Sequence, residues 1–246
     1  MKTMNELYRK NELTFALIWI AAYVVLSMIG DSLSEAVGVM KSVTLAIHLV
    51  MCGVLWAWIS KNSLKEKYDF RAPELPAWRF LFFVPLALIA LLHIVSGVQG
   101  GPTAADTVCC VLSMLCVGFL EEVIFRGLLF RAMAKTDVRS AVIVSSITFG
   151  LGHIVNLAGG KPLGDTLVQI LFAVAIGFIM VLIVYRGGSI IPCILFHSAN
   201  NMLSVLGRPN GLTPQVQLIV NLAEIVVLGV GYVLWLLKAL PPKQGA

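Results

Sequence analysis

Long apolar runs dominate this sequence and constrain its fold more than any other feature. Hydrophobic residues make up 59% of the 246 positions and charged residues only 13%, whereas soluble domains carry about 45–50% and 25%. A run of about 20 apolar residues can cross a bilayer as an α-helix. Eight such runs can be drawn: Leu13–Gly30, Met40–Ser60, Trp78–Val98, Asp106–Ala132, Ser140–Leu157, Thr166–Tyr185, Ser189–Leu206 and Gln215–Leu237. We therefore expect an all-α, polytopic membrane bundle of about eight transmembrane helices.

The segments between these runs are short and rich in glycine and proline, which favours turns. No tandem repeat or low-complexity tract occurs, so we expect a single membrane domain over residues 1–246, with a motif-bearing core at about 106–206. The first run is longer than the roughly 7–15 apolar residues of a signal peptide, and we interpret it as an uncleaved span. The five cysteines all lie in apolar runs, which indicates packing and not a disulfide framework.

Positive charges are distributed unevenly between the two ends of the expected spans. With the N-terminus placed in the cytoplasm, fifteen of the 18 lysines and arginines fall on the cytoplasmic side, and the other side carries only Lys41, Lys161 and Arg208. This bias follows the positive-inside rule. We therefore expect both termini in the cytoplasm, and the net charge of +5 reflects topology without implying a nucleic-acid partner.

Two adjacent glutamates, Glu121 and Glu122, interrupt the apolar run from Val108 to Phe130. A charged side chain at the bilayer centre costs roughly 2.5–3.5 kcal/mol on insertion scales, and Arg126 can compensate only one of the two carboxylates. Ionisable residues inside a span usually mark a functional site. We therefore expect the pair at an active site, with Glu122 tied to Arg126 and Glu121 left as the freer group.

Two further spans carry paired side chains at i,i+4 spacing, which places each pair on one helix face. Phe149 precedes His153 in FGLGH, and His197 precedes Asn201 in HSANN. In lipid, such polar faces point into the bundle or into a wet cavity, so both faces can share a pocket with the glutamates. Phe149 is expected to support this pocket by packing. The set of side chains suits the hydrolysis of an amide bond.

The polar members of this set have expected roles in that reaction. A positioned carboxylate can act as a general base, so we expect Glu121 to take a proton from a water molecule that His153 holds or polarises. His197 and Asn201 are expected to donate hydrogen bonds to the developing oxyanion. Together with Glu122, these residues form the predicted catalytic set.

The motifs EEVIFRG, FGLGH and HSANN resemble the EExxxR, FxxxH and HxxxN motifs of the type II CaaX-processing and bacteriocin-processing (Abi, CPBP) intramembrane proteases. Their order and their placement on separate spans also agree, from about Leu120 to Asn201. The resemblance implies an intramembrane endopeptidase in which Glu121 is the catalytic glutamate and His153, His197 and Asn201 are further essential residues. It also implies a membrane-associated peptide or protein substrate, and the compact loops favour a bacterial cell membrane.

The cofactor is left open by the sequence. The family is often described as metalloproteases, and a divalent ion such as zinc held by Glu121, His153 and His197 is chemically reasonable. However, no HExxH motif is present. We favour a glutamate-and-water mechanism without a metal.

Two other classes of function also stay open. Buried glutamates and histidines can form the relay of a proton-coupled transporter, although such carriers often contain inverted repeats and none is evident here. A non-catalytic immunity or chaperone protein that binds a peptide is the third class.

Several polar residues of the spans lie outside the three motifs. We interpret His48 and His93 as structural. Glu224, near the middle of the last span, is expected either to pair with Arg126 or to line a cavity.

The expected depths of the site residues differ along the spans. Counting at about 1.5 Å per residue places Glu121 toward the cytoplasmic side, His197 near the middle and His153 toward the outer end, a spread of order 10 Å. Gly150 and Gly152 are expected to permit close helix approach beside His153.

Overall fold

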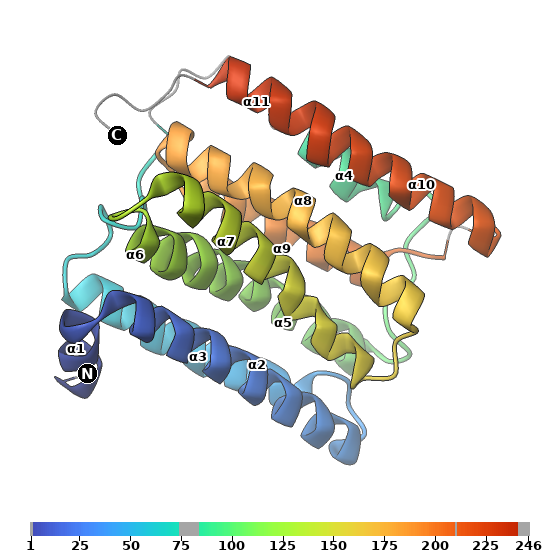
Figure 1. Cartoon of the computed structure of the whole chain (residues 1–246). Helices are drawn as coiled ribbons and strands as arrows, with labels where there is room; N and C mark the ends of the chain where they lie inside the picture. Colours follow the sequence, from blue (N-terminus) through green and yellow to red (C-terminus); the bar gives the residue numbers. More distant parts are fainter. Residues whose placement is uncertain (1, 74–83, 210, 241–246) are drawn as a thin grey trace.

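The computed structural model describes residues 2–73, 84–209 and 211–240, and these ranges are predominantly helical (Figure 1). They contain no β-strand apart from one isolated bridge between Val98 and Gly207. In chain order the elements are α1 (Lys2–Lys10), α2 (Glu12–Val37), α3 (Ser42–Lys61), α4 (Val84–Leu92), α5 (Ala104–Glu122), η2 (Val123–Phe130), α6 (Arg131–Met133), α7 (Val138–Leu151), η3 (Gly152–Leu157), α8 (Leu163–Gly187), α9 (Ile191–Leu206), α10 (Pro214–Val226), η4 (Val227–Tyr232) and α11 (Val233–Ala239). The predicted all-α membrane bundle is confirmed.

Among the residues that the structure describes, six helical stretches are long and apolar enough to cross a membrane. They cover Glu12–Val37, Ser42–Lys61, Ala104–Met133, Val138–Leu157, Leu163–Gly187 and Pro214–Ala239. The predicted span Ser189–Leu206 corresponds to α9, which is shorter at 16 residues. The predicted span Trp78–Val98 lies partly outside the described residues, and its described part contains α4. The count of eight therefore stays a prediction.

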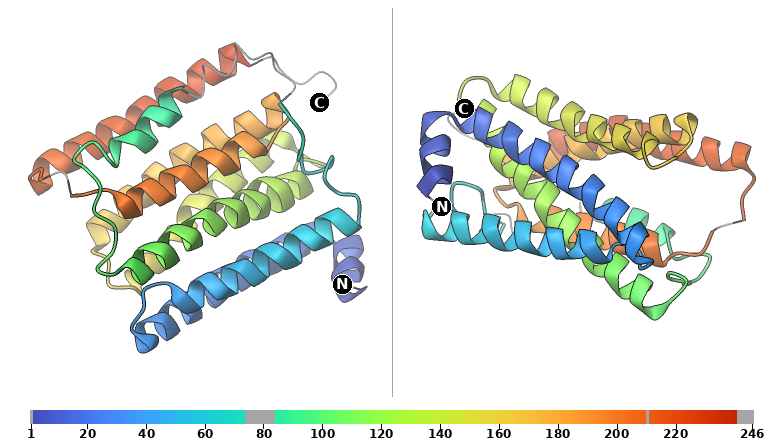
Figure 2. Two further views of the ribbon diagram at one scale, coloured as in Figure 1. Left: turned by 180° about the vertical axis from the view of Figure 1, so that it is seen from behind. Right: turned by 90° about the horizontal axis from the view of Figure 1, so that it is seen from below.

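The helices pack side by side in a bundle whose centre is formed by α5, α7, α8 and α9 (Figures 1 and 2). α5 lies against α9, and α7 lies against α8. The α2–α3 hairpin covers one side and contacts α5 through α3. On the opposite side, α10, η4 and α11 form one continuous rod that packs on α8, and α4 packs on α9. The central position of α5 places its C-terminal glutamates among the neighbouring helices.

Close helix contacts depend on small residues at three crossings. A Cβ atom at Gly118 of α5 would lie 2.5 Å from the backbone nitrogen of Ser198 in α9. At Gly30 it would lie 2.9 Å from Cα of Thr44, and at Gly150 it would lie 2.9 Å from a backbone atom of α8. Such small-residue contacts are typical of membrane bundles.

Gly152 behaves differently from Gly150. A Cβ atom there would meet nothing within 4 Å. The expectation of close helix approach is therefore right for Gly150 and wrong for Gly152.

The outward faces of the spanning helices remain apolar. On α2, for example, Leu17, Val25 and Ile29 are 51%, 53% and 46% exposed. In water such a surface would be costly, whereas hydrocarbon accommodates it. The ionisable residues Glu122 and Arg126, in contrast, are both 0% exposed. This inverted arrangement fits an integral, multi-pass membrane protein.

Charged side chains pair mainly at one end of the bundle. Glu12 at the start of α2 bonds to Lys67 and Lys135, each at 2.7 Å, and Asp69 pairs with Arg131. α1 and the C-terminal end of α11 lie at this same end in every view (Figures 1 and 2). Which side of the membrane this end faces stays a prediction.

Two spans change their helical geometry beside the predicted site residues. α5 ends at Glu122 and continues directly as the π-helix η2. α7 ends at Leu151 and continues as the 3₁₀-helix η3, which contains His153. Both irregular forms often occur where function requires an unusual backbone geometry.

Candidate active site

His197 of α9 stands between the two glutamates at the end of α5. Its Nδ1 atom lies 2.8 Å from Oε1 of Glu122, and its Nε2 atom lies 3.5 Å from Oε2 of Glu121. The side chain of His197 is 8% exposed. Gly118, one turn before the glutamates, lets α5 approach Ser198, the residue that follows His197. The predicted convergence of the first and third motifs therefore has a direct steric basis.

Glu122 is the fully buried member of the two carboxylates, and its contacts with charged or ring nitrogens all involve Oε1. Its Oε1 atom lies 3.2 Å from a guanidinium nitrogen of Arg126, and both side chains are 0% exposed. This geometry agrees with the predicted pairing. An ionised carboxylate can only accept hydrogen bonds, so Nδ1 of His197 carries the hydrogen of the Glu122 contact. That contact fixes the ring and leaves Nε2 directed at Glu121.

Glu121 is the more accessible carboxylate, with 13% of its side chain exposed against 0% for Glu122. Its Oε1 atom accepts a hydrogen bond of 2.7 Å from the hydroxyl of Tyr23. Its Oε2 atom faces His197. The two oxygens of Glu121 therefore have different surroundings, and Oε2 is the one beside the imidazole.

Phe149 contacts more of the site than its predicted packing role requires. Arg126 stacks on its ring with the guanidinium carbon 4.1 Å from the ring centroid. The rings of His153 and His197 both meet it edge-on, at centroid distances of 5.6 and 5.7 Å. Phe149 thus connects the three motifs, and cation–π stacking compensates part of the burial of Arg126.

His153 lies beside the site without a direct bond to the glutamates. Its Nδ1 atom is 3.3 Å from the backbone oxygen of Phe149, and no hydrogen bond or ion pair joins it to Glu121 or Glu122 in the described part of the chain. The structure therefore brings His153 next to Phe149. The expected role of His153, to hold or polarise the water that Glu121 deprotonates, stays a prediction.

Asn201 lies one helical turn after His197 on α9 and is half-buried. Its backbone oxygen accepts a hydrogen bond from Ser204, and its side chain has no hydrogen-bond partner among the residues that the structure describes. The neighbouring Asn200 has one, because its Oδ1 atom lies 3.2 Å from Nε2 of His93. The amide of Asn201 is therefore available to a ligand, whereas that of Asn200 ties α9 to the segment after α4.

Glu224 takes no part in this arrangement. It lies half-buried on α10, and Arg126, its expected partner, pairs with Glu122. Within residues 2–73, 84–209 and 211–240, no hydrogen bond or ion pair reaches the Glu224 carboxylate.

The side chains present do not form a ready three-ligand metal site. Among the described residues, no group of three or more His, Cys, Asp or Glu side chains could hold a metal ion. Nδ1 is engaged in both imidazoles, by Glu122 in His197 and by the backbone oxygen of Phe149 in His153, so only Nε2 of each ring could ligate a metal. We therefore derive no reaction step through a metal.

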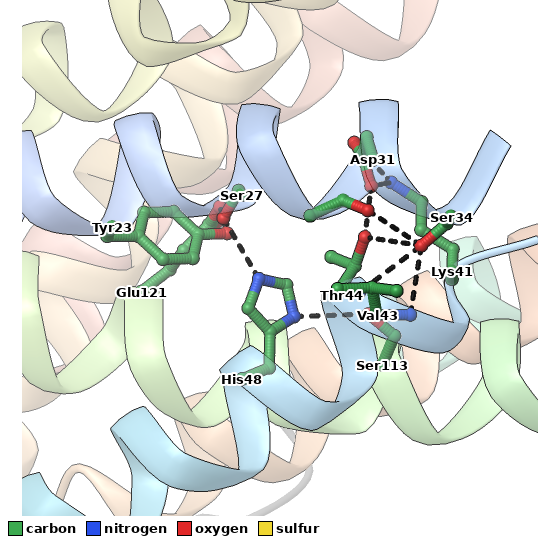
Figure 3. A network of polar contacts seen from close by, with 11 residues as sticks. Tyr23, Ser27, Asp31, Ser34, Lys41, Val43, Thr44, His48, Ser113 and Glu121 are labelled. Atoms are coloured by element: carbon green, nitrogen blue, oxygen red, sulfur yellow. Dashed lines mark hydrogen bonds and ion pairs between the residues drawn. The ribbon is translucent and has the colours of Figure 1, made fainter. Parts of the chain in front are cut away.

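Sequence reasoning missed Tyr23, because the first three spans carry no motif. A signal was nevertheless present, since Tyr23, Ser27 and Asp31 recur every four residues along an otherwise apolar helix. Such spacing predicts one polar face, and in lipid that face must turn inward. His48, interpreted as structural, bonds to Ser27 at 2.9 Å beside this face (Figure 3).

Comparison with known proteins supports the assignment of the motifs. The family model described as type II CAAX prenyl endopeptidase Rce1-like matches residues 102–203. This range contains the glutamate pair, FGLGH and HSANN. No curated protein matches the chain, and no solved structure does. The motif-bearing segment of this membrane protein therefore matches the Rce1-like family of type II CAAX prenyl endopeptidases, as the resemblance predicts.

Proposed function

We propose that this protein is an intramembrane endopeptidase in which Glu121 activates a water molecule. The observation that carries the proposal is the position of His197 between the two carboxylates, bonded to Glu122 and facing Glu121. One carboxylate pairs with Arg126 and fixes the imidazole, and the other directs its Oε2 atom at Nε2 of His197. Two carboxylates in different surroundings are typical of sites that divide orienting and proton-transfer roles.

In the proposed reaction, a water molecule binds beside Oε2 of Glu121. Glu121 takes one proton from it while the water oxygen bonds to the carbonyl carbon of the scissile amide. The carbonyl π electrons move to its oxygen. Glu121 then passes the proton to the amide nitrogen as the C–N bond breaks, which yields a carboxylic acid and an amine. The carboxylate of Glu121 is regenerated, so no other reagent is consumed.

Donors for the oxyanion come from α9 in this scheme. The amide of Asn201 donates directly, and His197 donates through Nε2 when both ring nitrogens carry hydrogen. A single oxyanion-hole donor is worth about 2.7–4 kcal/mol of transition-state stabilisation. His153, at the edge of the same site, is proposed to hold the attacking water with its free Nε2 atom.

The proposed substrates are peptides or proteins held at the membrane. The family description names CAAX prenyl endopeptidases, and a site enclosed by spanning helices favours a substrate that is itself anchored in or bound to the bilayer. The proposed location is a bacterial cell membrane, where a secreted or signalling peptide is the expected class.

Mass spectrometry of membrane peptides tests this function in cells. We expect uncleaved substrates to accumulate in cells that carry Glu121→Gln in place of the wild-type protein. Glu224→Gln is the matched control, because it neutralises a carboxylate of another span that lies outside the site. Unchanged peptides with a folded Glu121→Gln protein would contradict the proposal. Loss of solute uptake without a change in peptides would favour the transporter, and retained peptide binding without cleavage in the wild type would favour the chaperone.

A further inference from the structure

We propose that Tyr23 of α2 is a positioning residue for the base Glu121, an inference that rests on the proposed function. The phenol donates a hydrogen bond of 2.7 Å to Oε1 of Glu121 across the interface between α2 and α5. Tyr23 is 9% exposed, so water competes little for this bond. Tyr23 lies outside residues 102–203, the part of the chain that matches the family model. The α2–α3 hairpin thus contributes to the site as well as covering it.

The ring of Tyr23 is itself held in place by His48 of α3. The two rings stack with their centroids 5.7 Å apart and their planes 29° from parallel. His48 is 2% exposed and bonds through Nε2 to Ser27 at 2.9 Å and through Nδ1 to Ser113 at 3.1 Å (Figure 3). The stack therefore joins α2, α3 and α5, and the phenol has little freedom to leave Glu121.

The bond to Tyr23 decides which oxygen of Glu121 is free to act. A phenol next to a carboxylate donates its hydrogen, so Oε1 is occupied as an acceptor. The plane of the carboxylate is then fixed, and Oε2 is the oxygen that faces His197 at 3.5 Å. Removing the hydroxyl would let the carboxylate rotate away from the position in which Oε2 meets the water. A loss of orientation of this kind lowers the rate of the chemical step more than it weakens substrate binding.

The conservative variant Tyr23→Phe tests this role. It keeps the aromatic ring and its stack on His48 and removes only the hydroxyl. We expect kcat to fall about tenfold or more, a change of roughly one logarithmic unit in rate, while KM stays near the wild-type value. A smaller folded fraction would also lower the apparent kcat at unchanged KM, so the rates are compared per amount of folded protein.

Tyr232→Phe is the matched control for the loss of a buried phenol. Tyr232 is 6% exposed, and its hydroxyl has no hydrogen-bond partner among the described residues. It lies in η4, outside the site. We expect wild-type kinetics from this variant.

A double-mutant cycle measures the Tyr23–Glu121 bond without using activity. The thermal stabilities of Tyr23→Phe, Glu121→Ala and the double variant are compared in the same detergent. Residues in direct contact show coupling, whereas independent ones are additive. We expect Tyr23→Phe to destabilise the wild type more than it destabilises the Glu121→Ala background, and additive effects would overturn the inference.

The kinetic outcomes separate this inference from the proposed function. Lower kcat in Tyr23→Phe, with Glu121→Gln inactive and Tyr232→Phe unchanged, supports both. Wild-type kcat in Tyr23→Phe with Glu121→Gln inactive overturns the role of Tyr23 and leaves the protease intact. Full cleavage by a folded Glu121→Gln variant overturns the proposed function itself.

Discussion

The Nδ1 atom of His197 lies 2.8 Å from Oε1 of Glu122, a carboxylate with no exposed surface. This bond joins residues that are 75 positions apart in the sequence. It fixes the orientation of the imidazole, and the second ring nitrogen then meets Glu121. The adjacent glutamates therefore differ in role: Glu122 orients the imidazole of His197, and Glu121 is the proposed base.

The buried pair of Glu122 and Arg126 predicts an asymmetric response to mutation. Removing one partner leaves a charge buried without compensation, which typically costs about 3–5 kcal/mol. We expect Arg126→Met to lower the melting temperature strongly, because Glu122 then keeps only its contact with His197. The double variant Arg126→Met/Glu122→Gln removes both charges and should recover most of the lost stability. Thermal unfolding in detergent measures this, and a double variant less stable than Arg126→Met would contradict the prediction.

Gly118 predicts a steric effect on activity at a distance from the reacting atoms. In Gly118→Ala the new methyl group would lie 2.5 Å from the backbone nitrogen of Ser198, so α5 and α9 must separate. His197 would then move away from Glu122, and we expect cleavage to fall by an order of magnitude or more, as small displacements at active sites do. Gly152→Ala is the control, because its methyl group meets nothing within 4 Å. Equal activity in the two variants would show that the contact is not needed.

Asp137, which caps the N-terminus of α7, is expected to make a pH-dependent contribution to stability. The Ser140 hydroxyl and the backbone N–H groups of Ser140 and Arg139 donate to Asp137 and hold its pKa below the usual value. A depressed pKa means that the contribution is present at pH values above the unfolded-state pKa and is lost as the pH falls through the folded-state pKa. Asp137→Ala should therefore lower the melting temperature at neutral pH, and its difference from the wild type should shrink in acid. A constant difference across the titration would contradict this.

The ligand geometry also predicts the response to chelators. Because the three motifs bring together no group of three metal-binding side chains in the described part of the chain, we expect the purified protein to keep its cleavage activity in EDTA. The readout is initial rate before and after dialysis against the chelator. A loss that added zinc restores would instead assign a metal to this site.

Several features could be predicted from the sequence because local spacing determines them. The i,i+4 separation of Glu122 and Arg126 predicts their ion pair, and the spacing of His197 and Asn201 predicts a shared face. The membrane environment then requires polar faces to turn inward, which explains why the first and third motifs meet. The expected difference in depth between Glu121, His197 and His153 stays a prediction.

Other features depend on contacts between helices that no local pattern encodes. The bond from Tyr23 to Glu121 joins residues 98 positions apart and needs α2 to dock where α5 continues into η2. The change from α-helix to π-helix after Glu122 leaves no clear trace in residue spacing. The spacing of Phe149 and His153 predicts a packing role for Phe149, but its contacts with Arg126 and His197 follow from how the helices dock.

Cleavage of a membrane-anchored reporter by purified protein in liposomes tests the central claim most directly. Loss of a general base typically lowers the rate by about 10²–10⁴-fold, so we expect Glu121→Gln to show a loss of that size while Glu224→Gln cleaves like the wild type. Both variants must unfold at temperatures close to that of the wild type. A folded Glu121→Gln protein that cleaves the reporter at the wild-type rate would contradict the assignment of Glu121 as the base.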